Sequence, residues 1–463
     1  MKKKIIALVL GASATLTLAS CGGKAKPNFI CPEEFDTTQE ITIDFWHTMS
    51  KTALQPTLDE VIAEFKELYP NITVKHDQIG GYDEVREQII TNMGTHDYPN
   101  VAYCYPDHVA IYNEAEITVS LDDVMTNSKY GLGGSELKFT GTKKDEYVKA
   151  FLEEGRSFGD GLMYTMPFLK STEALFYNKD FFTANNLTVP TTWEEMWEVC
   201  AKIKEIDPSS TPLGYDSDSN LFITLAETYG YKYTSNNSFD FNNAGMRDLM
   251  KTFKENFDKG YFTTQAVYGT YTNELMTDVT KSSRAYMCVG STAGANYQAN
   301  ADGAFETGIA AVPHAAGKAA KSISQGPSLV LFKNENPQAV LATWLFVQYL
   351  NTATVQAKFA LASGYLPVTT PATEIPAYKE FLDQAAGNKA GIAALATKQA
   401  IAQTDNYFTS AVFLGSSYAR DEVGSLLSKI MLDLDINSSN IEKKIAVNLK
   451  DEIEKLDYLH GKV

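Results

Sequence analysis

An alternation of strand and helix patterns between residues 41 and 105 is the feature that most restricts the fold of this chain. Three short β-rich runs lie at 41–46, 72–78 and 99–105. Two segments with apolar residues on one helical face, at 56–70 and 81–93, separate them. This order is typical of an α/β layer, so the pattern predicts a largely parallel sheet covered by helices.

Later segments carry further helix patterns. The segment PTTWEEMWEVCAKIKEI at 190–206 predicts a helix that Thr192 caps, with Glu195 completing a capping box. Two more apolar helical faces lie at 336–351 and 439–456. The 463 residues are long enough for two domains.

The N-terminus reads as a secretion signal. MKKK is followed by the short apolar run IIALVLGASATLTL, which is too short for a comfortable transmembrane helix. The ending LASC at 18–21 resembles a bacterial lipobox, which implies cleavage before Cys21 and a lipid on its thiol. The alternative is an ordinary signal peptide with an incidental Cys. We expect a signal peptide at 1–20 and a lipidated tether at 21–37.

The charge of the chain excludes some partners. Removing Lys2, Lys3 and Lys4 with the signal peptide takes the formal charge from −17 to −20. Nucleic acid binding needs a basic face, and an acidic chain does not adhere to an anionic membrane by charge. We therefore expect no nucleic acid partner and a membrane attachment through the lipid alone.

The sequence contains few chemical motifs. It has no GxSxG, HExxH or GxxxxGK, and its six His residues show no metal spacing, so we expect no metal and no cofactor. The segment 216–227 has acidic residues at calcium-loop offsets, but Leu221 occupies the position that needs Gly. We interpret it as a polar loop that caps the following helix. We interpret the remaining cysteines as buried free thiols, and the sequence leaves disulfide pairing open. These cysteines are Cys31, Cys104, Cys200 and Cys288.

Seven segments, in order along nearly the whole mature chain, resemble one protein family. They are DFWHTM, YDEV, PNVAYCYPD, MPFLKSTEALFYNKD, PTTWEEM, QGPSLVLF and SGYLPV. This succession resembles the extracellular solute-binding lipoproteins of bacterial ABC importers, the large sugar-binding group. The FWH, YNKD and GYLP pieces are most similar to its glycerol-3-phosphate-binding branch.

The resemblance implies an architecture. It implies a periplasmic-binding-protein-like fold of two α/β lobes with three hinge crossings, near Lys170–Leu175, Ala311–His314 and Gly364. The first lobe would comprise 38–170 plus 312–363. The second would comprise 171–311 plus 364–463. The implied protein is a monomer that closes over a small-molecule ligand and delivers it to the transmembrane permease subunits of the importer.

The resemblance also implies ligand-binding positions. Arg420 matches the family position whose guanidinium takes a phosphate, and Asp107 could accept hydrogen bonds from the hydroxyls of a polyol. Where the branch carries two Trp, this chain has Ser219 and Phe222, so Phe222 and Tyr229 could form a reduced aromatic wall. The loop SGYLPV lies at a crossing, which turns Tyr365 toward the cleft. The full set is Tyr82, Asp107, Ser171, Thr172, Phe222, Ser291, Gly326, Tyr365 and Arg420.

Two functional hypotheses follow. The first is a non-catalytic importer subunit that binds a sugar, an oligosaccharide or a glycerol phosphate. The second is a secreted carbohydrate-active hydrolase, which would need two cleft carboxylates about 5–10 Å apart. Asp107 is the one acidic residue that the resemblance places in the cleft, so we favour binding over catalysis. The choice between a phosphorylated polyol and a neutral sugar stays open.

Overall fold

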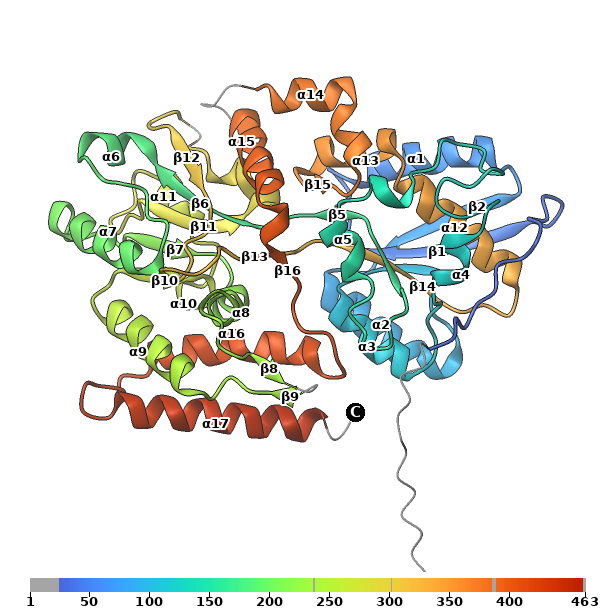
Figure 1. Cartoon of the computed structure of the whole chain (residues 1–463). Coiled ribbons are helices and arrows are strands. Elements are labelled where there is room, and N and C mark those ends of the chain that lie inside the picture. The colour runs from blue at the N-terminus through green and yellow to red at the C-terminus, as the bar shows by residue number, and fades with distance from the viewer. Residues whose placement is uncertain (1–24, 236–237, 301, 385–388, 461–463) are drawn as a thin grey trace, which may run out of the picture.

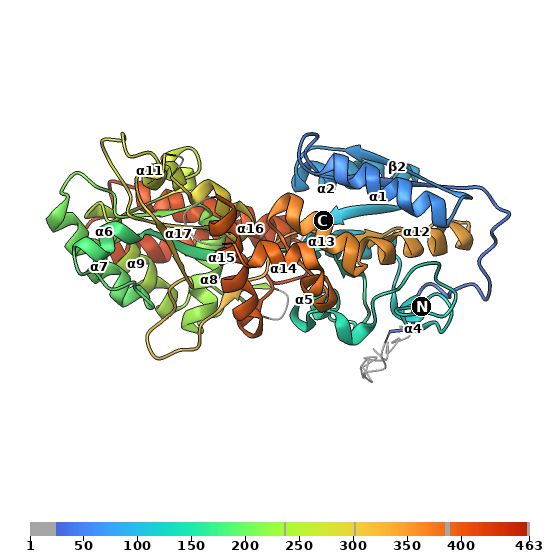
Figure 2. The same cartoon turned by 90° about the horizontal axis from the view of Figure 1, so that it is seen from above.

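The chain forms two lobes, each around a five-stranded sheet (Figures 1 and 2). The computed structural model describes residues 25–235, 238–300, 302–384 and 389–460. The segment expected to be a signal peptide and Cys21 therefore lie outside the described residues. Within those ranges, no helix combines the length and the apolar character needed to cross a membrane.

The first sheet contains the three strands that the alternation predicted. Its order is β2-β1-β3-β14-β4, and β1 pairs in parallel with both β2 and β3. The last two strands enter from later in the chain, and β14 is antiparallel to both β3 and β4. The bounds are β1 Ile41–His47, β2 Ile72–Gln78, β3 Val101–Cys104, β14 Ser328–Leu331 and β4 Thr165–Pro167.

Alternating side chains of this sheet enter different hydrophobic clusters, because successive residues of a strand point to opposite faces. In β3, Val101 and Tyr103 join the cluster of α1, α12 and α13. Ala102 and Cys104 join the cluster of α2 and α3 on the other face. The helices are α1 Gln55–Leu68, α12 Pro337–Leu350, α13 Ala353–Ser363, α2 Tyr82–Asn92 and α3 Pro106–Glu114.

The second sheet has the order β10-β7-β11-β6-β12. Strands β10, β7 and β11 are parallel, whereas β6 is antiparallel to β11 and β12. The strands are β10 Phe262–Thr264, β7 Leu213–Tyr215, β11 Met287–Ser291, β6 Glu173–Asn178 and β12 Thr307–Ala310. Its main helices are α7 Trp193–Ile206, α8 Asp218–Tyr229, α9 Ala244–Asp258, α15 Lys389–Ala402, α16 Ser416–Leu432 and α17 Ile441–His460.

Two small sheets lie where the chain passes between the lobes (Figure 1). Strand β5 (Leu169–Lys170) pairs with β15 (Leu366–Pro367), and β13 (Ser322–Ile323) pairs with β16 (Tyr407–Phe408). The expected second crossing at 311–314 still lies against the second lobe, because the backbone of His314 bonds to Thr191 and Trp193 at the start of α7. The chain joins the first sheet only at β14. The lobe boundaries stay a prediction.

Part of the segment expected as a tether is attached to the first lobe. The Asn28 side chain donates to the Thr118 carbonyl and its backbone amide donates to Ser120 Oγ. The Cys31 amide donates to Asp123 Oδ2, and Cys31 is buried. These contacts are made by single polar residues at long range, which composition alone does not reveal. From Asn28 onward the chain is therefore attached to the first lobe.

The structure confirms the predicted capping box and the predicted free cysteines. Thr192 Oγ1 accepts from the Glu195 amide and Glu195 Oε2 accepts from the Thr192 amide, so the capping box is confirmed. All four cysteines after Cys21 are buried free thiols. The remaining short elements are η1 Met93–Thr95, α4 Asp122–Thr126, η2 Lys144–Glu146, α5 Lys149–Glu154, α6 Lys179–Ala184, β8 Thr234–Ser235, β9 Ser238–Phe239, α10 Gln265–Tyr268, α11 Asn273–Thr277, η3 Thr292–Gln298, η4 Thr370–Glu374, α14 Pro376–Leu382 and η5 Thr404–Asn406.

Candidate functional site

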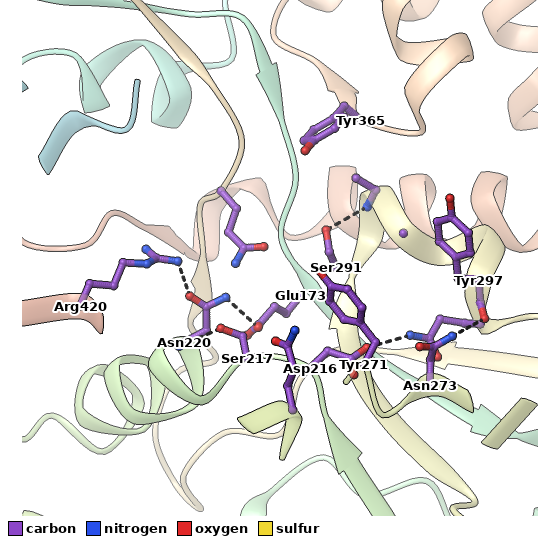
Figure 3. Close-up of a pocket in the computed structure, with 15 residues that line it drawn as sticks. Glu173, Asp216, Ser217, Asn220, Tyr271, Asn273, Ser291, Tyr297, Tyr365 and Arg420 are labelled. Carbon is purple, nitrogen blue, oxygen red and sulfur yellow. Dashed lines mark hydrogen bonds between the residues drawn. The ribbon is translucent and has the colours of Figure 1, made fainter. Parts of the chain in front are cut away.

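A pocket of about 650 Å³ lies where the second lobe meets the crossing segments (Figure 3). Most of its lining comes from the second lobe, where strand ends, loops and helices, chiefly η3, all contribute. Tyr365 reaches it from beside the crossing strand β15, and Arg420 from α16. The lining residues are Glu173, Asp216, Ser217, Asn220, Gln265, Tyr271, Asn273, Ser291, Ala293, Gly294, Tyr297, Gln298, Gln325, Tyr365 and Arg420.

Strand topology brings the polar floor of this pocket together. Parallel strands β7 and β11 end at the same edge of the sheet, where Asp216 follows β7 and Ser291 ends β11. Strand β6 runs the opposite way, so its first residue, Glu173, pairs with Ser291 at that edge. The carboxyl ends of parallel strands are the usual ligand-binding edge of an α/β sheet.

Glu173 is a buried carboxylate at the centre of a hydrogen-bonded chain. Its Oε2 accepts from the Tyr215 hydroxyl at 2.7 Å and its Oε1 from Asn220 Nδ2 at 2.9 Å. Asn220 Oδ1 in turn accepts from Arg420 Nη2 at 2.6 Å. Burial raises the pKa of Glu173 from 4.5 to about 7, although the bonds from Tyr215 and Asn220 and the charge of Arg420 oppose this.

Asp216 is the second carboxylate of the pocket floor. Its Oδ1 accepts from the backbone amide of Thr272 at 2.6 Å and from the Thr272 hydroxyl at 2.7 Å. Gln298 donates to its Oδ2 at 3.4 Å. Burial raises the pKa of Asp216, and the bonds from Thr272 oppose the rise. The floor thus carries two carboxylates within a hydrogen-bonded frame.

Exposed tyrosines form one side of the pocket. Tyr271 and Tyr297 are 60% and 68% exposed, although large aromatic side chains are usually mostly buried. Asn273 Nδ2 donates to the Tyr297 carbonyl at 2.9 Å and so joins the two loops that carry them. Tyr365 lies across the pocket from the floor (Figure 3). The sequence analysis missed Glu173, Asp216, Tyr271 and Tyr297, because a loop tyrosine or a strand-end acid has no motif.

The structure brings three of the predicted residues to the pocket: Ser291, Tyr365 and Arg420. Two others lie next to this group. The Tyr82 ring is 4.5 Å from that of Tyr105, over which the Arg420 guanidinium lies at 5.5 Å. Burial raises the pKa of Asp107, and the charge of Arg420 opposes the rise, so these two groups interact. Neither Tyr82 nor Asp107 is among the lining residues.

Three of the predicted ligand-binding residues contact other parts of the crossing region. Ser171 and Gln325 exchange backbone hydrogen bonds of 2.9 Å. Thr172 Oγ1 donates to the Ile323 carbonyl at 2.8 Å and is fully buried. Gly326 has φ +92°, and a Cβ there would overlap the Leu169 carbonyl. In this structure these residues therefore join crossing segments to each other.

The expectation of an aromatic wall at Phe222 is not met. Phe222 is fully buried in the core of the second lobe, where its ring packs 5.4 Å from that of Phe241. Helix α16 packs along α8, so nearly all sides of α8 are covered by protein. The neighbouring Ser217 caps α8 by accepting from the Asn220 amide, as the polar-loop reading predicted.

Known proteins resemble this chain in sequence and in fold. Residues 60–409 match the family described as bacterial extracellular solute-binding protein. The sn-glycerol-3-phosphate-binding periplasmic protein UgpB of Salmonella typhimurium is 24% identical over 392 residues, 81% of this chain and 84% of the relative. UgpB of Pectobacterium atrosepticum is 23% identical over 391 residues, 81% of this chain and 82% of the relative.

Solved structures share the fold. UgpB from Mycobacterium tuberculosis in complex with glycerophosphocholine has a TM-score of 0.68 at 22% identity, covering 89% of this chain and 99% of that one. The sugar-binding protein MalE from Xanthomonas citri has a TM-score of 0.70 at 17% identity, covering 91% and 100%. The GacH receptor of Streptomyces glaucescens has a TM-score of 0.68 at 19% identity, covering 90% and 98%. The two-lobed α/β architecture is thereby confirmed.

Proposed function

This chain belongs to the bacterial extracellular solute-binding proteins, and from that premise we propose that it is the lipid-anchored solute receptor of an ABC importer. It captures a carbohydrate-type ligand, which is a sugar, an oligosaccharide or a glycerol phosphate, in the pocket at the lobe junction. It then delivers that ligand to the permease subunits in the membrane. A lipid on Cys21 holds the protein at the outer face of the membrane.

The lining of the pocket carries the proposal. Hydroxyl-bearing ligands need acceptors and donors that converge, and the floor supplies carboxylates, amides and hydroxyls from Glu173, Asn220 and Ser291. The faces of Tyr271 and Tyr297 can pack against the apolar face of a sugar ring. Because Tyr365 lies beside a crossing strand, a rotation of the lobes would move it relative to the floor.

The carboxylate pair of the floor does not indicate a hydrolase. The relatives and structural neighbours are binding proteins, so the chain is a binding protein and not an enzyme. Both carboxylates are also engaged by protein donors: Glu173 by Tyr215 and Asn220, and Asp216 by Thr272. These hydrogen bonds satisfy both carboxylates, as buried polar groups require.

A thermal-shift screen tests the proposal. The purified mature protein is heated with maltose, maltotriose, sn-glycerol 3-phosphate and glycerophosphocholine, each at several concentrations. A ligand present at about 100 times its Kd stabilises the folded state by about 2.7 kcal/mol and raises Tm. Sodium sulfate at matched ionic strength is the control for a general salt effect. If no compound raises Tm above that control, the carbohydrate-type assignment is wrong.

A further inference from the structure

The charges that face the pocket are mainly negative. Among the lining residues in the described part of the chain, Glu173 and Asp216 are carboxylates and Arg420 is the one cation. Arg420 also interacts electrostatically with carboxylates that do not line the pocket. The charge of Arg420 opposes the pKa increase that burial causes at Asp107 and at Asp421, so both acids interact with it.

We propose that Glu173 contacts the ligand directly and selects an uncharged, hydroxyl-rich ligand against a phosphate-bearing one. The inference rests on the proposed function and deepens it by naming the ligand class. It also separates this chain from the relatives that are named for binding glycerol 3-phosphate. Glu173 stands at the first position of β6, on the first segment to enter the second lobe.

Glu173 lines the pocket and retains capacity to accept hydrogen bonds from ligand hydroxyls. Each carboxylate oxygen has two lone pairs, and each oxygen of Glu173 accepts one bond from the protein, from Tyr215 and Asn220. The remaining lone pairs can accept hydroxyl protons from a sugar. A phosphate group would bring negative charge to Glu173 and Asp216, whereas an uncharged sugar would not.

Arg420 does not reverse this preference. One of its donors is directed to Asn220 Oδ1, and its guanidinium lies 5.5 Å over the Tyr105 ring. Arg420 therefore orients the Asn220 amide, so that the nitrogen of that amide faces Glu173. The nearby cation Arg86 is already paired with Asp83 at 3.1 Å and with Glu87 at 3.2 Å.

The proposal makes ligand capture sensitive to pH. The groups that face Glu173 are Tyr215 and Asp216 from β7 and its end, Asn220 from α8, and Arg420 from α16. A sugar hydroxyl donates to the ionised form, so sugar binding favours loss of the Glu173 proton. With a pKa of about 7, the ionised fraction rises about tenfold between pH 6 and pH 8, and the apparent affinity should rise with it.

Calorimetric titration at pH 6 and pH 8 tests the inference. The full mature protein is titrated with maltose, maltotriose, sn-glycerol 3-phosphate and glycerophosphocholine. We expect at least one uncharged sugar to bind more tightly than either phosphate, by tenfold or more at pH 8. If a phosphate compound binds more tightly than every sugar, the inference is overturned and the proposed function stands. If none of the four binds, both are overturned.

Two variants test whether Glu173 determines this ligand selectivity. Glu173→Gln should weaken sugar binding at least about tenfold at pH 8 and remove its pH dependence, while glycerol 3-phosphate binding improves. Glu255→Gln removes the same charge from an exposed position on α9, outside the pocket, and should change neither. Sugar binding by Glu173→Gln with an unchanged affinity and pH profile overturns the inference.

A second variant covers the case in which Glu173→Gln does not fold. Tyr215→Phe removes one hydrogen bond that stabilises the carboxylate, but it leaves the carboxylate in the pocket. The pKa of Glu173 should then rise, so the midpoint of the affinity profile should move to higher pH. A purely structural role of Tyr215 would lower stability and leave that midpoint in place, which would count against ligand contact by Glu173.

Discussion

Lys170 Nζ lies 2.9 Å from Glu154 Oε2, and both side chains are buried. Lys170 stands on the crossing strand β5 and also donates to Ser328 Oγ at 3.0 Å. Glu154 in addition accepts from Ser324 Oγ at 3.2 Å. One buried ion pair thus joins α5 of the first lobe to strand β5 and to the segment from β13 to β14.

We expect Lys170→Met to be strongly destabilising. The change leaves Glu154 as an unpaired buried charge, and breaking such a pair costs about 3–5 kcal/mol. The double variant Lys170→Met/Glu154→Gln should recover part of this loss, because it removes the uncompensated charge. Urea unfolding monitored by circular dichroism measures both. Lys450→Met breaks the exposed pair with Glu454 and should cost far less stability, because water screens an exposed pair. Equal losses at Lys170 and Lys450 would contradict the prediction.

Stability without ligand should depend on pH through Glu173. Its pKa is about 7 in the folded protein and 4.5 ordinarily, so between these values the folded state holds a proton that the unfolded chain has lost. Unfolding free energy therefore falls as pH rises from about 4.5 to 7, by roughly 3 kcal/mol from this group, and levels off above that. Urea titrations at pH 5, 6, 7 and 8 should show a shallower fall for Glu173→Gln. Parallel profiles for the two proteins would refute the assignment.

Removal of the exposed rings should weaken binding and spare stability. Tyr271→Ala and Tyr297→Ala each delete an aromatic face of the pocket, and a stacked contact is worth about 0.5–1.5 kcal/mol, so a loss of about two- to tenfold in affinity is expected. Tm should change little, because both side chains are more than half exposed. Phe at either position should retain most of the affinity. Ile206→Ala, at an exposed apolar position outside the pocket, serves as the control.

Arg420→Ala should lower affinity for either class of ligand, for different reasons. The change frees Asn220, whose amide then loses its fixed orientation toward Glu173, and it removes charge-assisted donors worth about 1.5–3 kcal/mol each. We expect at least about a tenfold loss, with partial recovery in Arg420→Lys because Lys keeps the charge and loses the planar fork. Titration at two salt concentrations separates the reasons, since affinity for an uncharged sugar should barely respond to salt. Normal ligand binding by Arg420→Ala would show that Arg420 does not contribute to the site.

The membrane anchor is tested at Cys21. Cys21→Ser removes the thiol that the lipobox-like LASC presents for lipidation, so the protein should appear in the medium or remain unprocessed. Cell fractionation with immunoblotting measures this. Cys31→Ser, at the next cysteine along the chain, should leave the fractionation unchanged. A Cys21→Ser protein that stays in the membrane fraction like the parent would disprove the lipoprotein reading.

Local periodicity was enough to predict much of the fold. The run ITVKHDQ has the bounds of β2, and the helix patterns at 56–70 and 190–206 correspond to α1 and α7. The Thr192–Glu195 capping box depends on residues three positions apart, so it is written in the sequence itself. These features could be predicted because the interactions that create them lie within one element or between neighbouring elements.

The pocket depends on contacts that sequence spacing does not describe. Arg420 and Asn220 are 200 positions apart and meet because α16 packs along α8. The same packing buries Phe222, which the sequence alone leaves equally free to face a ligand. Glu173 looks like an ordinary strand residue until β6 pairs antiparallel with β11 and sets it beside Ser291.

By itself, the sequence of this protein determined the α/β class, the positions of several helices and strands and the resemblance to solute-binding proteins. Each of these follows from short-range patterns or from segments that keep their order. Only the tertiary structure decided which side chains face the pocket and what charge they carry together. The physical reason is that burial and charge are properties of an environment, and the environment of Glu173 is made by Tyr215, Asn220 and Arg420 from three other elements.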